Sequence, residues 1–204
     1  MKVKNDCVVF HSSERIEFVV DKTNNKTIMA SFSNIAENLM FDYIIMVNDQ
    51  FSYRLVEAEF YLYCSVHKDP YPHNENRQLE MGQWYFHDSG IDITFGSNGD
   101  YGGILIRSIQ RVSGGKYFNG PWVVRRELLS YLTKAANGKL SLKVIPDSKN
   151  ELDPTATISK SVRIGINPVK DKTEDKKYYT ATYRFVLDAN NPKNRLRKEN
   201  LIPL

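Results

Sequence analysis

The residues best suited to chemistry lie on one short segment, Glu57-Ala58-Glu59-Phe60-Tyr61. At the two-residue period of a β-strand, Glu57, Glu59 and Tyr61 share one face, and the apolar residues between them share the other. Carboxylates at this spacing lie roughly 6–7 Å apart, close enough for each to influence the protonation of the other. This arrangement favours a proton-transfer role. Glutamate on the solvated face of an antiparallel strand is also common, so the segment alone leaves both interpretations open.

Basic side chains form a second candidate set, in a chain whose formal net charge is +4. The set comprises Arg107, Arg111, Lys116, Arg125 and Arg126. Clustering of this kind suits contact with phosphate groups. An ordinary solvated surface is the alternative, and charge alone does not separate the two.

Cys64, His67, His73 and His87 follow one another closely enough to suggest a metal site with nitrogen and sulfur ligands. Their spacing matches no familiar zinc signature, so we expect no metal. The glycine-rich segment 96–103 lacks the Lys-Ser/Thr pair and the helix start of a phosphate-binding loop. A tight turn is the expected structure there.

The composition describes a globular chain: 204 residues, 41% hydrophobic and 25% charged, which is enough for one domain with its own core. No apolar run approaches the roughly 18–20 residues that cross a bilayer, and the first residues lack the apolar core of a signal peptide. Only two cysteines, Cys7 and Cys64, are present, so a disulfide framework is not expected. We therefore expect a cytoplasmic monomer with no membrane association.

Hydrophobic periodicity and turn residues predict the secondary structure. The expected strands are 7–10, 16–20, 43–47, 53–62, 83–87, 91–95, 103–109, 161–166 and 178–187. One helix is expected after a cap at Ser33 or Asn34. A second begins at Pro121, carries Val124 and Leu128 on its apolar face and ends near 137–138. Together these elements predict an α+β fold: a single domain with a curved, mostly antiparallel sheet and a few flanking helices.

The ordered set of motifs resembles the methylpurine (3-methyladenine or alkyladenine) DNA glycosylase family. The similarity includes Ile-Ala-Glu-Asn-Leu-Met at 35–40, Val-Glu-Ala-Glu-Phe-Tyr-Leu at 56–62, a loop with Asp69 and His73, Gly-Gln-Trp-Tyr at 82–85, Gly-Ile-Leu-Ile-Arg-Ser at 103–108, Asn-Gly-Pro at 119–121, Val-Arg-Ile-Gly-Ile at 162–166 and Tyr-Arg-Phe-Val at 183–186. It extends over about residues 35–190. Because the similarity does not include residues 1–30, we expect these residues to form an N-terminal extension packed on or beside a glycosylase-like domain, 31–204.

The resemblance implies base-excision repair. A damaged purine, alkylated or deaminated, is flipped out of DNA into a pocket, and water displaces it from the sugar. Glu59 matches the general base that activates the water, and Arg107 matches the arginine that holds the water or the phosphate. Tyr61 matches the aromatic that stacks on the base, and His73 matches a pocket histidine, with His67 as the competing candidate. The reaction uses water alone, so no cofactor is expected.

The chain departs from the family pattern around the pocket. His87 stands where the family has a second stacking tyrosine, and Asp92 falls near the position of a pocket asparagine. The stretch that carries the family's wedge tyrosine is shorter here, and residues 87–91 offer no bulky substitute. Damaged duplex or single-stranded DNA is the expected partner, contacted by Arg111, Lys116, Arg125 and Arg126. The alternative is a non-catalytic nucleic-acid-binding or structural protein on the same scaffold.

Overall fold

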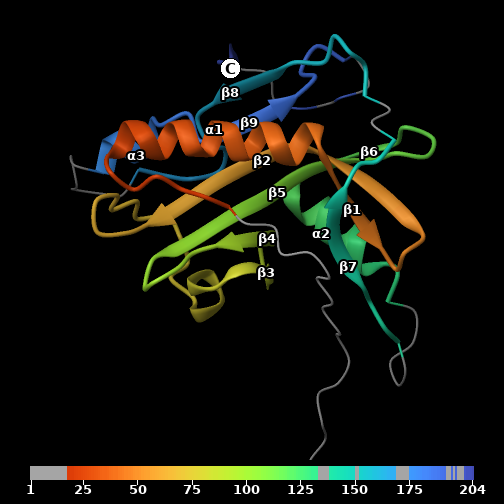
Figure 1. Ribbon diagram of the computed structural model, residues 1–204, viewed down its shortest axis with the longest axis horizontal. Coiled ribbons are helices and arrows are strands. Elements are labelled where there is room, and N and C mark those ends of the chain that lie inside the picture. The colour runs from red at the N-terminus through yellow and green to blue at the C-terminus, as the bar shows by residue number, and fades with distance from the viewer. Residues whose placement is uncertain are drawn as a thin grey trace, which may run out of the picture.

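The structure, a computed structural model, describes residues 18–132, 138–149, 152–168, 175–191, 194, 196 and 200–204. Its helices are α1 (Asn25–Phe41), η1 (Asn76–Leu79), α2 (Pro121–Leu129) and α3 (Lys176–Tyr179). Its strands are β1 (Tyr43–Val47), β2 (Phe51–Tyr63), β3 (Met81–His87), β4 (Gly90–Phe95), β5 (Tyr101–Arg111), β6 (Tyr117–Asn119), β7 (Leu142–Pro146), β8 (Ile158–Ser161), β9 (Arg184–Leu187) and β10 (Ile202–Pro203). Figure 1 shows α1 lying along the sheet.

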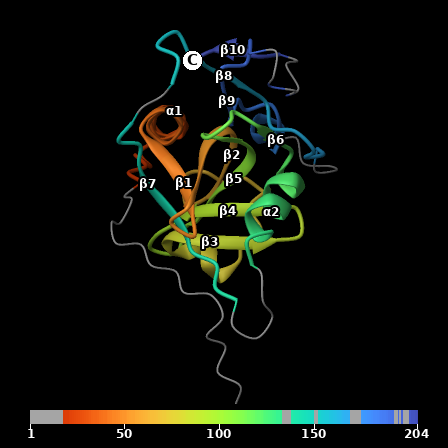
Figure 2. The same ribbon diagram turned by 90° about the vertical axis from the view of Figure 1, so that its right-hand side faces the viewer.

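The strands form one sheet in the order β10-β8-β9-β2-β5-β4-β3, and β1, β6 and β7 join it at β2, β5 and β1. These pairings are antiparallel. Helices α1 and α2 flank the long strands β2 and β5 (Figure 2). The expected α+β fold with a mostly antiparallel sheet is confirmed. Within the described residues, no helix has both the length and the apolar character needed to cross a membrane.

Helix α1 begins earlier than the sequence predicted. The Asn24 side chain accepts hydrogen bonds from the backbone N–H groups of Lys26 and Thr27, and the Thr27 hydroxyl completes a capping box. The cap expected at Ser33 or Asn34 is therefore wrong, because a stronger cap lies upstream. The helix also crosses the expected division at residue 30. Residues 18–20 are not a strand, and the candidate strand 7–10 lies outside the described residues.

Strand β2 is buried on both faces, which excludes the interpretation of its glutamates as solvated. Phe60 packs on Phe32 of α1, with ring centroids 4.9 Å apart, and on Phe185 of β9 at 5.2 Å. On the other face, the exposed fractions of Glu57 and Glu59 are 3% and 0%. The two carboxylates are therefore held inside the protein, where their partners decide what each can do.

The C-terminal strand predictions need correction. Strand β8 ends at Ser161, so the predicted strand 161–166 is wrong, and residues 162–168 form a loop in which Gly165 has a φ of +81°. Of the predicted strand 178–187, only Arg184–Leu187 form a strand, β9. Residues 176–179 instead form α3, whose Tyr178 is buried in the core. Helix α2 begins at Pro121 as predicted but ends at Leu129, before the expected stop at 137–138. Residue 137 lies outside the described residues.

Candidate functional site

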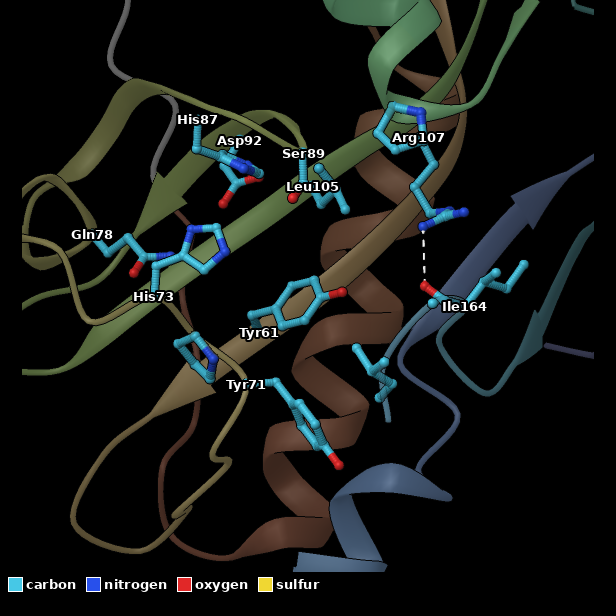
Figure 3. Close-up of a pocket in the computed structure, with 14 residues that line it drawn as sticks. Tyr61, Tyr71, His73, Gln78, His87, Ser89, Asp92, Leu105, Arg107 and Ile164 are labelled. Atoms are coloured by element: carbon cyan, nitrogen blue, oxygen red, sulfur yellow. Dashed lines mark hydrogen bonds and ion pairs between the residues drawn. The ribbon is translucent and has the colours of Figure 1, made fainter. Parts of the chain in front are cut away.

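A cavity of about 420 Å³ opens on the face of β2, β4 and β5 that carries Tyr61 (Figure 3). Its size falls within the range of about 300–1,000 Å³ typical of small-molecule sites. It is lined by Tyr61, Tyr71, Pro72, His73, Gln78, His87, Ser89, Asp92, Leu105, Arg107, Pro121, Ile164, Gly165 and Ile166. The structure thus brings together all four residues predicted for the base pocket, Tyr61, His73, His87 and Asp92, with Arg107.

The strand register places two carboxylates, Glu59 and Asp92, in one row on the side of the sheet that faces the cavity. Glu59 of β2 is paired with Leu105 of β5, and Leu105 is paired with Asp92 of β4. Directly paired residues point to the same face of a sheet, so all three side chains lie on the cavity side. Two strand spacings separate the Cα atoms of Glu59 and Asp92 by roughly 10 Å.

Glu59 lies directly behind the cavity wall, fully buried and fully bonded. Its Oε1 accepts a hydrogen bond from the backbone N–H of Ile164 at 2.6 Å. Its Oε2 accepts from the hydroxyl of Tyr61 at 2.9 Å and from the guanidinium of Arg107 at 3.2 Å. Burial raises the pKa of Glu59, and Arg107 and the two hydrogen bonds oppose that rise. All three partners line the cavity, so Glu59 is one side chain away from it.

Arg107 joins Glu59 to its neighbours. The β2–β5 ladder shifts register on either side of Glu57, and Arg107 falls between the paired residues Ile106 and Ser108. Such irregularities re-aim a side chain. The guanidinium donates to Glu57 at 3.2 Å. It also donates to the backbone carbonyl of Ile164 at 3.3 Å (Figure 3). Burial disfavours the charge on Arg107, but the two glutamates outweigh burial and raise the pKa of Arg107, so it stays a cation.

Glu57 belongs to a set of buried ion pairs under the cavity. Its carboxylate accepts from Arg184 at 2.6 Å and from the hydroxyl of Ser108 at 2.7 Å. A second buried pair is separate from Glu57: Arg163 holds Asp69 through two hydrogen bonds, at 2.6 and 3.2 Å, with both side chains fully buried. We call Glu57, Asp69, Arg163 and Arg184 the ion-pair cluster.

Arg163 also supports the aromatic side chain predicted to stack on a base. Its guanidinium carbon lies 4.5 Å from the centre of the Tyr61 ring. A cation over an aromatic face is attracted to it. The ring is therefore fixed at its hydroxyl by Glu59 and at its face by Arg163, while the side chain still lines the cavity.

His73 and His87 line the side of the cavity opposite Arg107, and the Tyr85 ring packs against both (Figure 3). We call His73, Tyr85 and His87 the histidine wall. The His87 and Tyr85 rings are stacked, with centroids 5.1 Å apart, and the His73 ring meets His87 edge-on at 4.6 Å. The Nε2 atom of His87 lies 2.9 Å from Oδ1 of Asp92. His87 therefore lines the cavity with one ring nitrogen tied to a carboxylate.

Gly103 makes room for that carboxylate. A Cβ at this position would lie 2.8 Å from Oδ2 of Asp92 and 3.1 Å from Nε2 of Gln78. The first distance is shorter than real Cβ contacts and the second is unusually tight, so a side chain here would push Asp92 and crowd Gln78. The glycine therefore allows two polar side chains to lie over β5 on the cavity floor.

His67 is excluded from the cavity. Its ring is buried in the core, where Nδ1 lies 2.7 Å from the side-chain oxygen of Asn25. Of the two candidates for the pocket histidine, the cavity therefore contains His73. Among the described residues, no group of three or more His, Cys, Asp or Glu side chains could hold a metal ion. Cys64 is a buried free thiol.

The predicted DNA-contacting residues have different surroundings. Arg111 is tied to the hydroxyls of Tyr53 and Tyr131 and lies 3.9 Å from Glu127. Arg125 donates to the backbone carbonyl of His87 at 2.8 Å, so it braces the turn that carries the histidine wall. Two others stay accessible on aromatic rings: Lys116 lies 4.8 Å from the ring centre of Phe118, and Arg126 lies 5.1 Å from that of Trp122.

Several site residues gave no usable sequence signal. Tyr71 and Gln78 lie between the predicted strands 53–62 and 83–87, and Ile164 was assigned to a strand. The contribution of Ile164 comes from its backbone, which donates to Glu59 and accepts from Arg107. Gly165, one residue later, is the feature that could have indicated a break in the strand there.

Comparison with known proteins adds one relative. The chain is similar to an uncharacterized protein of Acanthamoeba polyphaga mimivirus, at 34% identity over 48% of this chain and 56% of the viral protein. The match thus spans about half the length of that relative. No protein-family model matches the chain.

Proposed function

We propose that this protein hydrolyses the N-glycosidic bond of a damaged purine in DNA, with Glu59 as the general base. The observation that carries the proposal is a buried carboxylate, held by three hydrogen bonds, immediately behind a cavity lined by Tyr61 and Arg107. Groups of perturbed pKa beside a cavity are typical of catalytic sites. The motif resemblance over residues 35–190 supports the same activity.

Each cavity residue has a role in the proposed reaction. The flipped base enters the cavity and packs against Tyr61, because a base inside the duplex cannot be reached. A water at Arg107 and the Ile164 carbonyl lies next to Glu59, which takes its proton as oxygen attacks the sugar carbon. The ionised carboxylate also stabilises the positive charge that develops on the sugar.

The surface next to the cavity suits nucleic acid. Pro121 lines the cavity, and its neighbour Trp122 is 57% exposed with the guanidinium of Arg126 on its ring. An exposed aromatic with an adjacent cation can stack on a base and neutralise a phosphate. We further propose that the partner is DNA, single-stranded or duplex, and that the protein acts as a monomer in the cytoplasm.

The test is base release from oligonucleotides that carry hypoxanthine, N7-methylguanine or an N3-alkylated adenine, in single-stranded and duplex form, with abasic sites revealed by alkaline cleavage. We expect Glu59→Gln to slow release at least about 100-fold, because the amide keeps the shape but cannot accept the proton. Glu37→Gln, the same change at an exposed site on α1, is the matched control. Release by Glu59→Gln at the wild-type rate would remove Glu59 from the reaction.

One observation favours the second candidate, a non-catalytic nucleic-acid-binding protein. Glu59 has no exposed surface, and both its oxygens already accept hydrogen bonds, as a purely structural carboxylate would. This candidate predicts binding that weakens steeply with salt. It also predicts that no base is released from any oligonucleotide of the panel.

A further inference from the structure

We infer that the substrate is single-stranded DNA, and that Trp122 is a platform on which the base next to the flipped base stacks. The inference rests on the proposed function and extends it from the cavity to the adjoining surface. It concerns how the neighbouring nucleotide is held once one base has entered the cavity.

The first argument is the shape of the cavity rim between β3 and β4. Strand β3 ends at His87 and β4 begins at Gly90, so the turn between them consists of Asp88 and Ser89. Proteins that open duplex DNA commonly insert a bulky apolar side chain between base steps. Asp88 and Ser89 are exposed but small and polar, so this turn offers no such side chain. A single strand does not require one, because its bases are not paired with a second strand.

The second argument is the position of Trp122 beside the cavity. Helix α2 lies against β4 (Figure 2), and Arg125 of this helix donates to the backbone carbonyl of His87 at 2.8 Å. Pro121, the first residue of the helix, lines the cavity. The Cα of Trp122 is about 3.8 Å from that of Pro121, because the two residues are consecutive. A nucleotide that follows the flipped one along the strand can therefore reach Trp122.

The third argument is the exposure of the Trp122 ring. Its side chain is 57% exposed, and no other Trp, Tyr or Phe in the part of the chain that the structure describes is exposed. An aromatic ring offers a large apolar surface on which a base can stack. Every base has such a face, so the platform accepts any neighbour of the damaged purine.

The fourth argument is the charge around the ring. Arg126 lies one helical turn after Trp122, and its guanidinium carbon is over the Trp122 ring, 5.1 Å from the ring centre. The carboxylate of Glu127 accepts from the hydroxyl of the buried Tyr53 at 2.6 Å, so it is directed toward the core. The surface beside Trp122 therefore presents a cation that can neutralise the phosphate of a stacked nucleotide.

The contact with Arg126 also distinguishes stacking from insertion. A ring covered on both faces could not keep an exposure of 57%, so the face of Trp122 away from Arg126 is open. A side chain inserted into a duplex is covered on both faces by base pairs, and Trp122 would lose Arg126 there. A base stacked on the open face leaves the contact with Arg126 in place.

The first experiment measures the affinity of a labelled single strand with hypoxanthine at its centre, in the Glu59→Gln background so that the base is retained. Stacking on an aromatic side chain accounts for about 5- to 150-fold in affinity. We expect Trp122→Ala to weaken binding about 10-fold, and Trp122→Phe to stay within about 3-fold of Trp122, because a phenyl ring also stacks. Leu132→Ala, which removes another exposed apolar side chain, is the matched control and should leave the affinity unchanged.

Two further strands identify the stacked base, since each has an abasic spacer in place of one neighbour of hypoxanthine, on the 5′ or the 3′ side. We expect one spacer to weaken binding as much as Trp122→Ala does. Combining that spacer with Trp122→Ala should add less than about 2-fold, because both changes remove the same contact. The other spacer should leave the effect of Trp122→Ala intact.

The second experiment compares base release by the wild type from the single strand and from a duplex of the same sequence. We expect release from the single strand to be at least about 10-fold faster, because only the duplex requires a base pair to be broken. Trp122→Ala should raise KM for the single strand and leave kcat within about 2-fold, as expected for a residue that binds away from the reacting atoms.

The outcomes separate this inference from the proposed function. If Trp122→Ala weakens binding by the same factor with and without each spacer, or if the duplex is processed as fast as the single strand, the inference is overturned and the proposed function stands. Coupling between Trp122 and one spacer in a protein that releases no base would contradict the proposed function and support the platform.

Discussion

Glu59 and Asp92 stand in register on either side of Leu105, yet they are held in opposite ways. Glu59 is bonded by a backbone N–H, a tyrosine and an arginine, and it lies behind the cavity wall. Asp92 is bonded by one imidazole, and both rest in the cavity lining. One carboxylate is fixed by the fold, whereas the other is paired with His87, whose Nδ1 has no hydrogen-bond partner within the part of the chain that the structure describes.

The same contrast separates the regions around them. The ion-pair cluster beneath Glu59 consists of buried charges that compensate one another. Removing Asp69 there leaves Arg163 without its carboxylate in a dry environment. The histidine wall around Asp92 consists of rings in mutual contact at the edge of a cavity. Changes in the cluster should therefore reduce stability, and changes in the wall should reduce activity.

The largest expected effect on stability is that of Asp69→Ala. It leaves the fully buried guanidinium of Arg163 without its carboxylate, which should lower the free energy of unfolding by about 3–5 kcal/mol. Urea unfolding followed by circular dichroism measures the loss. His73→Ala, on the exposed side of the histidine wall, is the comparison and should cost less than about 1 kcal/mol. Equal losses for the two variants would refute the contrast between the regions.

A second expected effect is a fall in stability in mild acid. Burial, aided by Arg163 and Lys177, lowers the pKa of His67 from 6.5 to about 4. As pH falls below 6.5, His67 binds a proton in the unfolded chain but not in the folded one. Stability is therefore lost progressively until about pH 4. The loss attributable to this group is about 3 kcal/mol, because each unit of pKa difference corresponds to about 1.4 kcal/mol.

Urea unfolding at pH 7.5 and pH 4.5 tests this effect. The difference in unfolding free energy between the two pH values should shrink in His67→Gln, whatever that change does to stability at neutral pH. His73→Gln, which alters an exposed ring, should leave most of the difference in place. A difference that persists unchanged in His67→Gln would assign the acid sensitivity to other groups.

Sequence periodicity located the central strands, because alternation and turn residues are local signals. Five strands, β1 to β5, and the start of α2 at Pro121 follow the predictions closely. The burial of both faces of β2 was not predictable, since the cover for Glu57 and Glu59 comes from Arg184 and the 162–168 loop, more than 100 residues away. Backbone donors such as the Ile164 N–H leave no signature in residue types.

The pairing of His87 with Asp92 shows a different limit. Both residues were predicted to line the pocket, and the strands that carry them, 83–87 and 91–95, were predicted, but their pairing as a hairpin was not. The bond between them depends on the space above Gly103, which only the packed sheet defines. The sequence thus identified His87 and Asp92 as site residues but did not predict the hydrogen bond between them.

The smallest expected effect concerns the outer surface, where Arg126 and Arg111 provide a comparison between a free and a tied guanidinium. Arg126 is exposed and stacked on Trp122, whereas Arg111 is held by Tyr53, Tyr131 and Glu127. If Arg126 contacts one phosphate, Arg126→Gln should reduce the slope of log affinity against log salt by about 0.9. Arg111→Gln should change this slope less, because Arg111 already has a carboxylate partner.

Fluorescence of Trp122 measures the binding, since the other tryptophan, Trp84, is buried. Lys26→Gln on α1 is the control for the loss of one positive charge. If the slope of log affinity against log salt fell as much in Lys26→Gln as in Arg126→Gln, a specific phosphate contact of Arg126 would be contradicted.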